Sequence, residues 1–207
     1  MSQPSDQPLI VSAARRAEPE YDPDERKILL QIAHEAILSF CEGRQISFSA
    51  PSPHLAEPRG VFTTLYSSQK LRGCVGLPVA TLPLFKAVAE TARAAASEDP
   101  RFMRVTSQEA RSLRISVSIL SPLSSIMSTE IQIGRHGLVI SQGGRRGLLL
   151  PQVPVEHGWD RNTFLEQTCL KAGLPCDAWH SGAHIEAFTA EIFGDSDFDT
   201  ADPGFNK

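Results

Sequence analysis

The sequence predicts an α+β fold in one compact domain, with about three main helices and a mixed or antiparallel sheet. Apolar residues recur at helical spacing from Ile28 to Phe40, and they alternate with polar residues from Leu113 to Leu120, the period of a half-buried strand. Helical and extended segments follow one another without a regular βαβ repeat. A chain of 207 residues is also long enough to bury a core without a metal or a disulfide.

Three segments carry the start and stop signals of helices. We expect these helices at residues 23–42, 81–98 and 161–171. Asp22, Thr81 and Asp160 are their expected N-caps, because side-chain oxygens of these residue types accept from free N–H groups of the first turn. Gly43 and Gly173 follow the first and third helices, where glycine commonly ends a helix.

Seven short segments rich in β-branched and apolar residues are expected to be strands. They are residues 61–66, 71–76, 113–120, 131–133, 137–140, 147–150 and 184–193. The short link 67–70 predicts that the first two strands form a hairpin. Gly143 and Gly144 predict a second hairpin turn, because glycine supplies the positive φ that tight hairpin turns need.

Composition excludes several classes of protein. Twenty Lys and Arg residues against 24 Asp and Glu residues give a net charge of −4, which argues against nucleic acid as a partner. No run approaches about 18 apolar residues, so we expect no membrane span. The first residues lack the charged and apolar regions of a signal peptide, and the expected location is cytoplasmic.

The cysteines and histidines predict neither disulfides nor a metal site. Cys41, Cys74, Cys169 and Cys176 contain no CxxC pair, and the six histidines are scattered along the chain. Without a secretion signal, four free thiols are the better interpretation. No nucleotide-binding, zinc-protease or hydrolase motif is present, so the cofactor is unknown at this stage.

The thiol of greatest interest lies in the sequence LRGCVG. Period-two geometry places Arg72 and Cys74 on one face of the strand, with Leu71 and Val75 on the other. A guanidinium beside a thiol favours the thiolate, which is the reactive form of cysteine. Gly73 would let a ligand approach the backbone closely. The alternative is a small buried cysteine in a tight strand, with glycines that mark a bulge.

Two further segments carry side chains suited to a ligand. Asp99 and Arg101 follow the second expected helix, and such a pair in a proline-fixed turn can brace a site or clamp an anion. The alternative is a helix stop with a local salt bridge. His157 lies beside Glu156, and the two offer an acid and an imidazole for a ligand site. The alternative is a loop that leads to the helix cap at Asp160.

Several blocks of the sequence, in order, resemble the signature blocks of the AMMECR-domain family. They are FTTL at 62–65, LRGCVG at 71–76, DPRF at 99–102, ISVSILSP at 115–122, LLPQV at 149–153, GWD at 158–160 and KAGLP at 171–175. We therefore expect an AMMECR-like domain at residues 23–194. A flexible arm is expected at residues 1–22 and a loose acidic tail at residues 195–207.

The resemblance implies two lobes around a cleft, with the LRGC strand near that cleft. It also implies a family without an established reaction. Bacterial members resemble protein A of the AmmeMemoRadiSam system, so the resemblance implies a Memo-like protein and a radical SAM enzyme as partners.

Two functions follow as hypotheses. In the first, the protein is an enzyme or enzyme component in which Cys74 is a nucleophile or redox thiol beside Arg72, and Asp99 and Arg101 position substrate. In the second, it is a non-catalytic adaptor for a small molecule or peptide, and Cys74 is inert packing. We expect Arg72, Cys74, Asp99 and Arg101 to converge in one cleft, although 25 residues separate Cys74 from Asp99.

Overall fold

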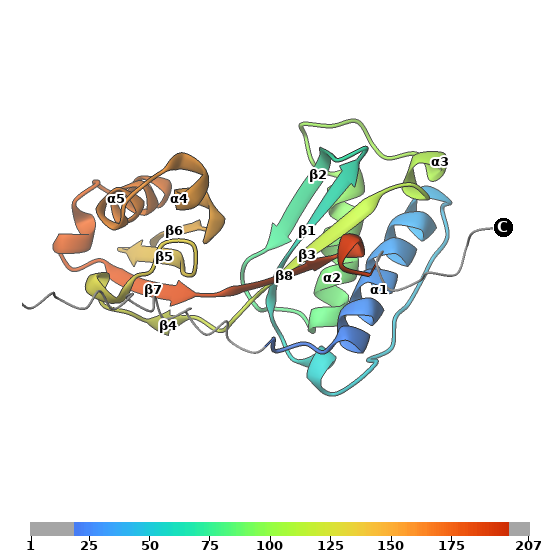
Figure 1. Ribbon diagram of the computed structural model, residues 1–207, viewed down its shortest axis with the longest axis horizontal. Helices are drawn as coiled ribbons and strands as arrows, with labels where there is room; N and C mark the ends of the chain where they lie inside the picture. The colour runs from blue at the N-terminus through green and yellow to red at the C-terminus, as the bar shows by residue number, and fades with distance from the viewer. Residues whose placement is uncertain (1–18, 199–207) are drawn as a thin grey trace, which may run out of the picture.

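A computed structural model describes residues 19–198, and it has the predicted α+β fold, arranged as two lobes (Figure 1). Each lobe contains one four-stranded antiparallel sheet. The strand order is β2-β1-β3-β8 in the larger lobe and β4-β7-β5-β6 in the smaller lobe. Three helices are long, as predicted: α1, α2 and α5 have 19, 14 and 11 residues.

Both ends of the described chain lie in the larger lobe, and the smaller lobe is formed by the segment between β3 and β8. The larger lobe contains α1 (Pro23–Cys41), η1 (His54–Ala56), β1 (Gly60–Ser67), β2 (Lys70–Leu77), α2 (Leu84–Ser97), α3 (Ser107–Ala110), β3 (Arg114–Leu120), β8 (Ala190–Gly194) and η4 (Asp195–Asp197). The smaller lobe contains β4 (Ser124–Ser125), η2 (Ser128–Glu130), β5 (Gly137–Gln142), β6 (Arg145–Leu149), α4 (Gln152–His157), α5 (Arg161–Lys171), η3 (Ala178–His180) and β7 (His184–Phe188).

The main core lies between one face of the larger sheet and the helices α1 and α2. On β1, Val61, Thr63 and Leu65 are fully buried on this face. The hydroxyls of Thr63 and Thr91 hydrogen-bond at 2.7 Å, which satisfies the polar groups that β1 and α2 bury together. The opposite face of the sheet, which the helices of this lobe leave uncovered, is called the open face below. It carries Phe62, Thr64, Cys74, Ser116 and Ser118.

Two chain crossings join the lobes. The chain leaves β3 through residues 121–123, and it returns from β7 to β8 through Thr189. The crossings are tied to each other, because the Ser121 N–H donates to the Thr189 carbonyl at 2.9 Å and the Thr189 N–H donates to Ser121 Oγ at 3.0 Å. Beside them, Leu120 of the larger lobe and Phe188 of the smaller lobe belong to one buried apolar cluster.

The strands follow the sequence prediction with three exceptions, the first of which is the two-residue strand β4, which was not expected. The segment 184–193 was expected to be one strand, but it divides at Thr189 into β7 and β8, which belong to different sheets. Residues 131–133 were expected to be a strand and are not one. Ile131 is buried in the core of the smaller lobe, which accounts for the apolar residue at this position, but it is not paired in a strand. The two predicted hairpins, β1–β2 and β5–β6, are confirmed.

The three long helices follow the prediction except at the start of α2. This helix begins at Leu84 with Pro83 as its N-cap, and Thr81 instead closes a turn through its N–H to the Val79 carbonyl. The predicted caps Asp22 and Asp160 are confirmed. The short helices α3 and α4 were not expected. Within residues 19–198, no helix combines the length and the apolar character needed to cross a membrane.

The ordered fold extends beyond the boundaries expected from composition. Residues 1–18 and 199–207, which make up most of the expected arm and tail, lie outside the described residues. Tyr21, which was expected in the flexible arm, is fully buried, and its ring stacks on His54 with centroids 4.8 Å apart. Burial raises the pKa of the Tyr21 hydroxyl. The core contact of an aromatic ring outweighs the polar composition around it.

Asp195, which was expected in the loose tail, connects the end of β8 to β3 and α1 through its carboxylate. Its carboxylate accepts from the Ile115 N–H at 2.7 Å and contacts His34 Nε2 at 3.0 Å. Burial opposes ionisation of this carboxyl, but the hydrogen bonds from His34 and the Ile115 N–H outweigh it, and the pKa of Asp195 is held below its ordinary value. The ionised form therefore stabilises the fold.

We expect Asp195→Asn to lower the free energy of unfolding at pH 7 by about 1–3 kcal/mol, the usual cost of losing hydrogen bonds to a buried charge. Because the pKa of Asp195 is lowered in the folded state, the contribution is present above its ordinary value of 3.8 and is lost as the pH falls below it. Urea unfolding at pH 7 and pH 3 measures both effects. The exposed Glu156→Gln is the control, and equal stability of the two variants at pH 7 would contradict the assignment.

Candidate functional site

A β-bulge in β2 determines which side chains of the LRGC segment lie on the open face and which lie on the helix side of the sheet. Near the turn, Ser67 pairs with Lys70 and Tyr66 pairs with Leu71, but further along Leu65 pairs with Gly73 and Thr64 pairs with Cys74. One residue of β2, Arg72, is therefore extra. Without this extra residue, Thr64 would pair with Gly73, and the Cys74 side chain would point toward the helices.

The bulge corrects the strict alternation that was expected around Arg72. The alternation predicted that Leu71 and Val75 share one face of the strand and that Cys74 lies on the other. Leu71 instead pairs with Tyr66, which is on the same face of the sheet as Thr64, so Leu71 lies on the face that carries Cys74. Leu71 is 41% exposed, whereas Val75 packs against the main core. Cys74 is thus placed on the open face, and Gly73 is placed on the helix side.

Cys74 is half-buried. It makes one hydrogen bond through its side chain and one through its backbone N–H. Thr64 Oγ1 donates to Cys74 Sγ at 3.3 Å. The Cys74 N–H points out from the edge of the sheet and donates to Asp99 Oδ2 at 2.8 Å. The turn after α2 therefore meets the LRGC strand, as predicted, although the two motifs are far apart in the sequence.

Asp99 connects the Cys74 backbone to Arg101. Its carboxylate accepts from the Arg101 N–H at 3.1 Å and from the Arg101 guanidinium through Nε at 2.9 Å and Nη2 at 2.7 Å. The Asp99 side chain is 3% exposed and that of Arg101 is 55% exposed. The hydrogen bonds from Arg101 and from the Cys74 N–H hold the pKa of Asp99 well below its ordinary range, in spite of burial.

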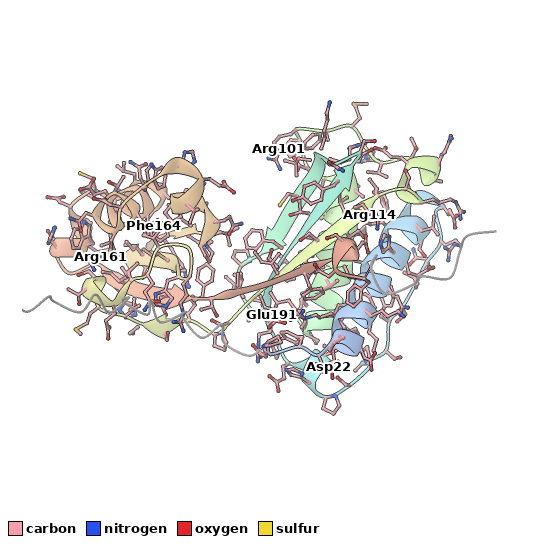
Figure 2. All side chains as sticks on the ribbon, viewed as in Figure 1. Asp22, Arg101, Arg114, Arg161, Phe164 and Glu191 are labelled. Atoms are coloured by element: carbon pink, nitrogen blue, oxygen red, sulfur yellow. The ribbon has the colours of Figure 1, made fainter. Side chains whose placement is uncertain are left out.

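Arg101 is held near the thiol-bearing strand, because its guanidinium and the Cys74 N–H donate to the same Asp99 carboxylate. The hydrogen bonds to Asp99 raise the pKa of Arg101. Figure 2 shows Arg101 at the rim of the larger lobe, far from Phe164 in the core of the smaller lobe. The turn thus presents an exposed cation close to Cys74.

Arg72 does not act as the free neighbour of Cys74 that the sequence suggested. Both Nε and Nη2 of its guanidinium donate to the Glu109 carboxylate of α3. The centroid of the Phe102 ring lies 5.9 Å from Arg72 Cζ and 5.4 Å from Arg101 Cζ, so one ring contacts both paired arginines. Arg72 Nη1 is buried and has no acceptor among the described residues.

The sequence predicts that Gly73 and His157 contact a ligand. In the structure, Gly73 lies against α2, and His157 lies in the smaller lobe. Gly73 packs against α2, where an added Cβ would lie 2.2 Å from the Ala95 carbonyl oxygen. His157 is exposed at the end of α4 in the smaller lobe, and its ring stacks on Trp159 at 4.7 Å. Arg72, Cys74, Asp99 and Arg101 therefore form the candidate site in the larger lobe, with Gly73 beside them on the helix side of β2 and His157 in the smaller lobe.

A hollow of about 390 Å³ is lined by residues of both lobes, but none of the four site residues lines it. It is lined by Pro58, Arg59, Gly60, Pro78, Val79, Ala80, Leu120, Ser121, Pro122, Leu123, Arg146 and Glu186. Within residues 19–198, no group of three or more His, Cys, Asp or Glu side chains is arranged to hold a metal ion. The candidate site is consequently built from the thiol, its hydroxyl donor and the Asp99–Arg101 pair.

Sequence reasoning missed Thr64, Glu109 and Phe102 as parts of this site. Phe102 belongs to the DPRF block, and the resemblance alone could have singled it out. Thr64 was hidden because its register with Cys74 depends on the bulge. No local pattern links Glu109 to Arg72, since the contact joins residues 37 positions apart.

Known proteins match most of this chain. The model of the AMMECR1 family matches residues 30–193. Protein MK0488 of Methanopyrus kandleri is 45% identical over 183 residues, which cover 82% of this chain and 88% of that protein. Protein MJ0810 of Methanocaldococcus jannaschii is 43% identical over 180 residues, which cover 82% and 90%. The crystal structure of the uncharacterized protein PH0010 from Pyrococcus horikoshii matches with a TM-score of 0.70 and 40% identity, over 80% of this chain and 89% of that one.

We expect Gly73→Ala to destabilise the larger lobe by about 1–3 kcal/mol, because the methyl group would force β2 and α2 apart at the Ala95 carbonyl. Urea unfolding followed by circular dichroism measures the change. Leu71→Ala, on the same strand but exposed, is the control and should change stability by less than about 0.5 kcal/mol. A Gly73→Ala variant as stable as the control would show that this close approach does not constrain the fold.

Proposed function

The chain belongs to the AMMECR1 family, and from this membership and the geometry around Cys74 we propose that it is an enzyme, or a component of an enzyme, that uses the Cys74 thiol. The observation that carries the proposal is the placement of Sγ on the open face, with a hydroxyl donor at 3.3 Å and with the Arg101 guanidinium bound to the carboxylate that accepts from the Cys74 N–H. A thiol needs such surroundings to react as the thiolate at neutral pH.

The roles of the surrounding residues follow from their contacts. Asp99 holds the Cys74 N–H and the Arg101 guanidinium together, so it fixes the position of the thiol relative to the cation. Arg101 is exposed enough to contact an anionic group of a substrate. Arg72, expected as the partner of the thiol, supports the site from the bulge through its ion pair with Glu109.

The other three thiols lie in surroundings that differ from those of Cys74. Burial raises the pKa of the Cys169 thiol, and that residue is fully buried. Burial, followed by the charges of Glu109 and Glu42, raises the pKa of the Cys41 thiol, which donates to the Val105 carbonyl at 3.3 Å. Cys176 is exposed. Cys74 is the thiol beside both a hydroxyl donor and a cation.

We expect iodoacetamide at neutral pH to alkylate Cys74 faster than Cys41, Cys169 and Cys176, because the hydroxyl and the guanidinium favour its thiolate. Peptide-resolved mass spectrometry of the folded protein over a time course measures the four rates. Cys74→Ser is the control that identifies the labelled peptide. Labelling of Cys74 at the same rate as the buried Cys169, or no labelling, would refute a reactive thiol.

The second candidate is a non-catalytic adaptor that binds a small molecule or a peptide of a partner. It is favoured by the contacts that hold Asp99, Arg101 and Phe102 in place, since a preorganised charged turn serves binding as well as catalysis. In this case the Cys74 thiol is packing, and only the exposed Arg101 contacts the ligand. The alkylation experiment separates the two candidates.

We propose that the partners are a Memo-like protein and a radical SAM enzyme, on the basis of the resemblance to protein A of the AmmeMemoRadiSam system. Co-expression with tagged partners encoded in the same genome should capture the wild-type chain. Arg101→Ala should reduce capture several-fold if the exposed guanidinium contributes to the interface, because charged anchors dominate such contacts. Cys74→Ser is the matched variant and should be captured as well as wild type. Failure of the wild-type chain to associate with either protein would refute the partnership.

A further inference from the structure

We propose that Thr64 is the positioning residue of the Cys74 thiol, and that its hydroxyl sets how readily the thiol reacts. This inference rests on the proposed function, since it concerns the same site, but it names a residue outside the LRGC and DPRF blocks. Thr64 Oγ1 donates to Cys74 Sγ at 3.3 Å, within the range of a hydrogen bond to sulfur. A donor to sulfur stabilises the thiolate relative to the thiol.

The position of Thr64 is fixed by the sheet. It lies in the middle of β1, which pairs with β2 on one side and β3 on the other, so its backbone is held from both sides. Threonine is branched at Cβ, and few χ1 rotamers are open to it in a strand. The hydroxyl is therefore held near Sγ at low entropic cost, which is the property of a positioning residue.

The bulge at Arg72 is an independent sign that this pairing matters. A regular hairpin with the same turn would place Gly73 opposite Thr64 and would turn Cys74 toward the helices. The chain departs from regular pairing by one residue, and the result is the Thr64–Cys74 contact. Bulges commonly redirect a side chain beside a functional site.

The neighbouring groups leave Thr64 as the direct hydrogen-bond donor to the thiol. Thr63, next in the sequence, faces the helices and is bonded to Thr91 at 2.7 Å. The charged groups around the thiol are Arg101 and Asp99 from the turn after α2, Arg72 on β2 and Glu109 on α3. Each of these arginines donates to a carboxylate, whereas the Thr64 hydroxyl donates directly to Sγ.

The experiment compares the rate of Cys74 alkylation by iodoacetamide from pH 5 to pH 10 in Thr64→Val, Thr64→Ser and wild type. Valine keeps the shape and the strand propensity of threonine but removes the hydroxyl. We expect Thr64→Val to slow alkylation at pH 7 about tenfold, the size expected from one hydrogen bond to a charged group, and to move the pH midpoint upward. Thr64→Ser should restore most of the wild-type profile.

Two controls separate the hydrogen bond from an effect on folding. Ser116→Ala removes a hydroxyl from β3, on the far side of Thr64 from Cys74, and should leave the profile unchanged. Thermal unfolding should show that the variants are folded at the temperature of the assay. The rate at Cys176 in the same samples normalises the reagent.

The outcomes distinguish this inference from the proposed function. If Cys74 remains the fastest thiol and Thr64→Val has the wild-type profile, Thr64 is not the positioning residue, and the proposed function stands. If Thr64→Ser is slowed as much as Thr64→Val, the methyl group matters and not the hydroxyl, which also overturns the inference. If Cys74 is no faster than Cys169 in wild type, the proposed function itself fails.

Discussion

The arrangement of the candidate site depends on one extra residue in β2. The bulge at Arg72 shifts the pairing of β1 with β2 by one position, and every side chain beyond it changes face. Gly73 thereby reaches the helix side, where only hydrogen fits beneath the Ala95 carbonyl. Cys74 reaches the open face and lies opposite Thr64. The packing of α2 on the sheet and the exposure of the thiol therefore follow from the same local irregularity.

Asp99 completes this arrangement at the edge of the sheet. β2 is an edge strand, and the Cys74 N–H would otherwise point away from the sheet without a strand partner. The Asp99 carboxylate accepts this N–H and also holds Arg101, so a structural need of the edge strand and the placement of a cation near the thiol are met by one side chain. Such a buried carboxylate is stable only because several donors surround it. An ordinary helix stop with a local salt bridge would not require a contact 25 residues away.

The sequence predicted the parts of the structure that local signals encode, and it missed those that depend on distant contacts. The caps Asp22 and Asp160 are recognisable because a cap acts within its own helix. The convergence of Cys74 with Asp99 was predicted from the turn at Pro100 and the reach of Arg101, although the length of the helix between them argued against it, and the two residues do meet in a hydrogen bond. The alternation predicted around Arg72 was wrong, because the bulge depends on how β2 pairs with β1, which no local pattern in β2 encodes. The burial of Tyr21 was also missed, because composition alone does not show which aromatic ring packs in the core.

The two lobes and the candidate site share the open face. Adjacent rows of side chains cross this face: Gly76 and Phe62 form one row, and Cys74 and Thr64 form the next. The Phe62 ring packs over Gly76, where an added Cβ would lie 2.1 Å from the ring, and it joins the apolar cluster that includes Phe188 of the smaller lobe. The smaller lobe therefore contacts the open face at Phe62, in the row next to that of the thiol. Because the same two strands carry both rows, the apolar junction of the lobes at Phe62 lies one row of side chains from the pair formed by Cys74 and Thr64.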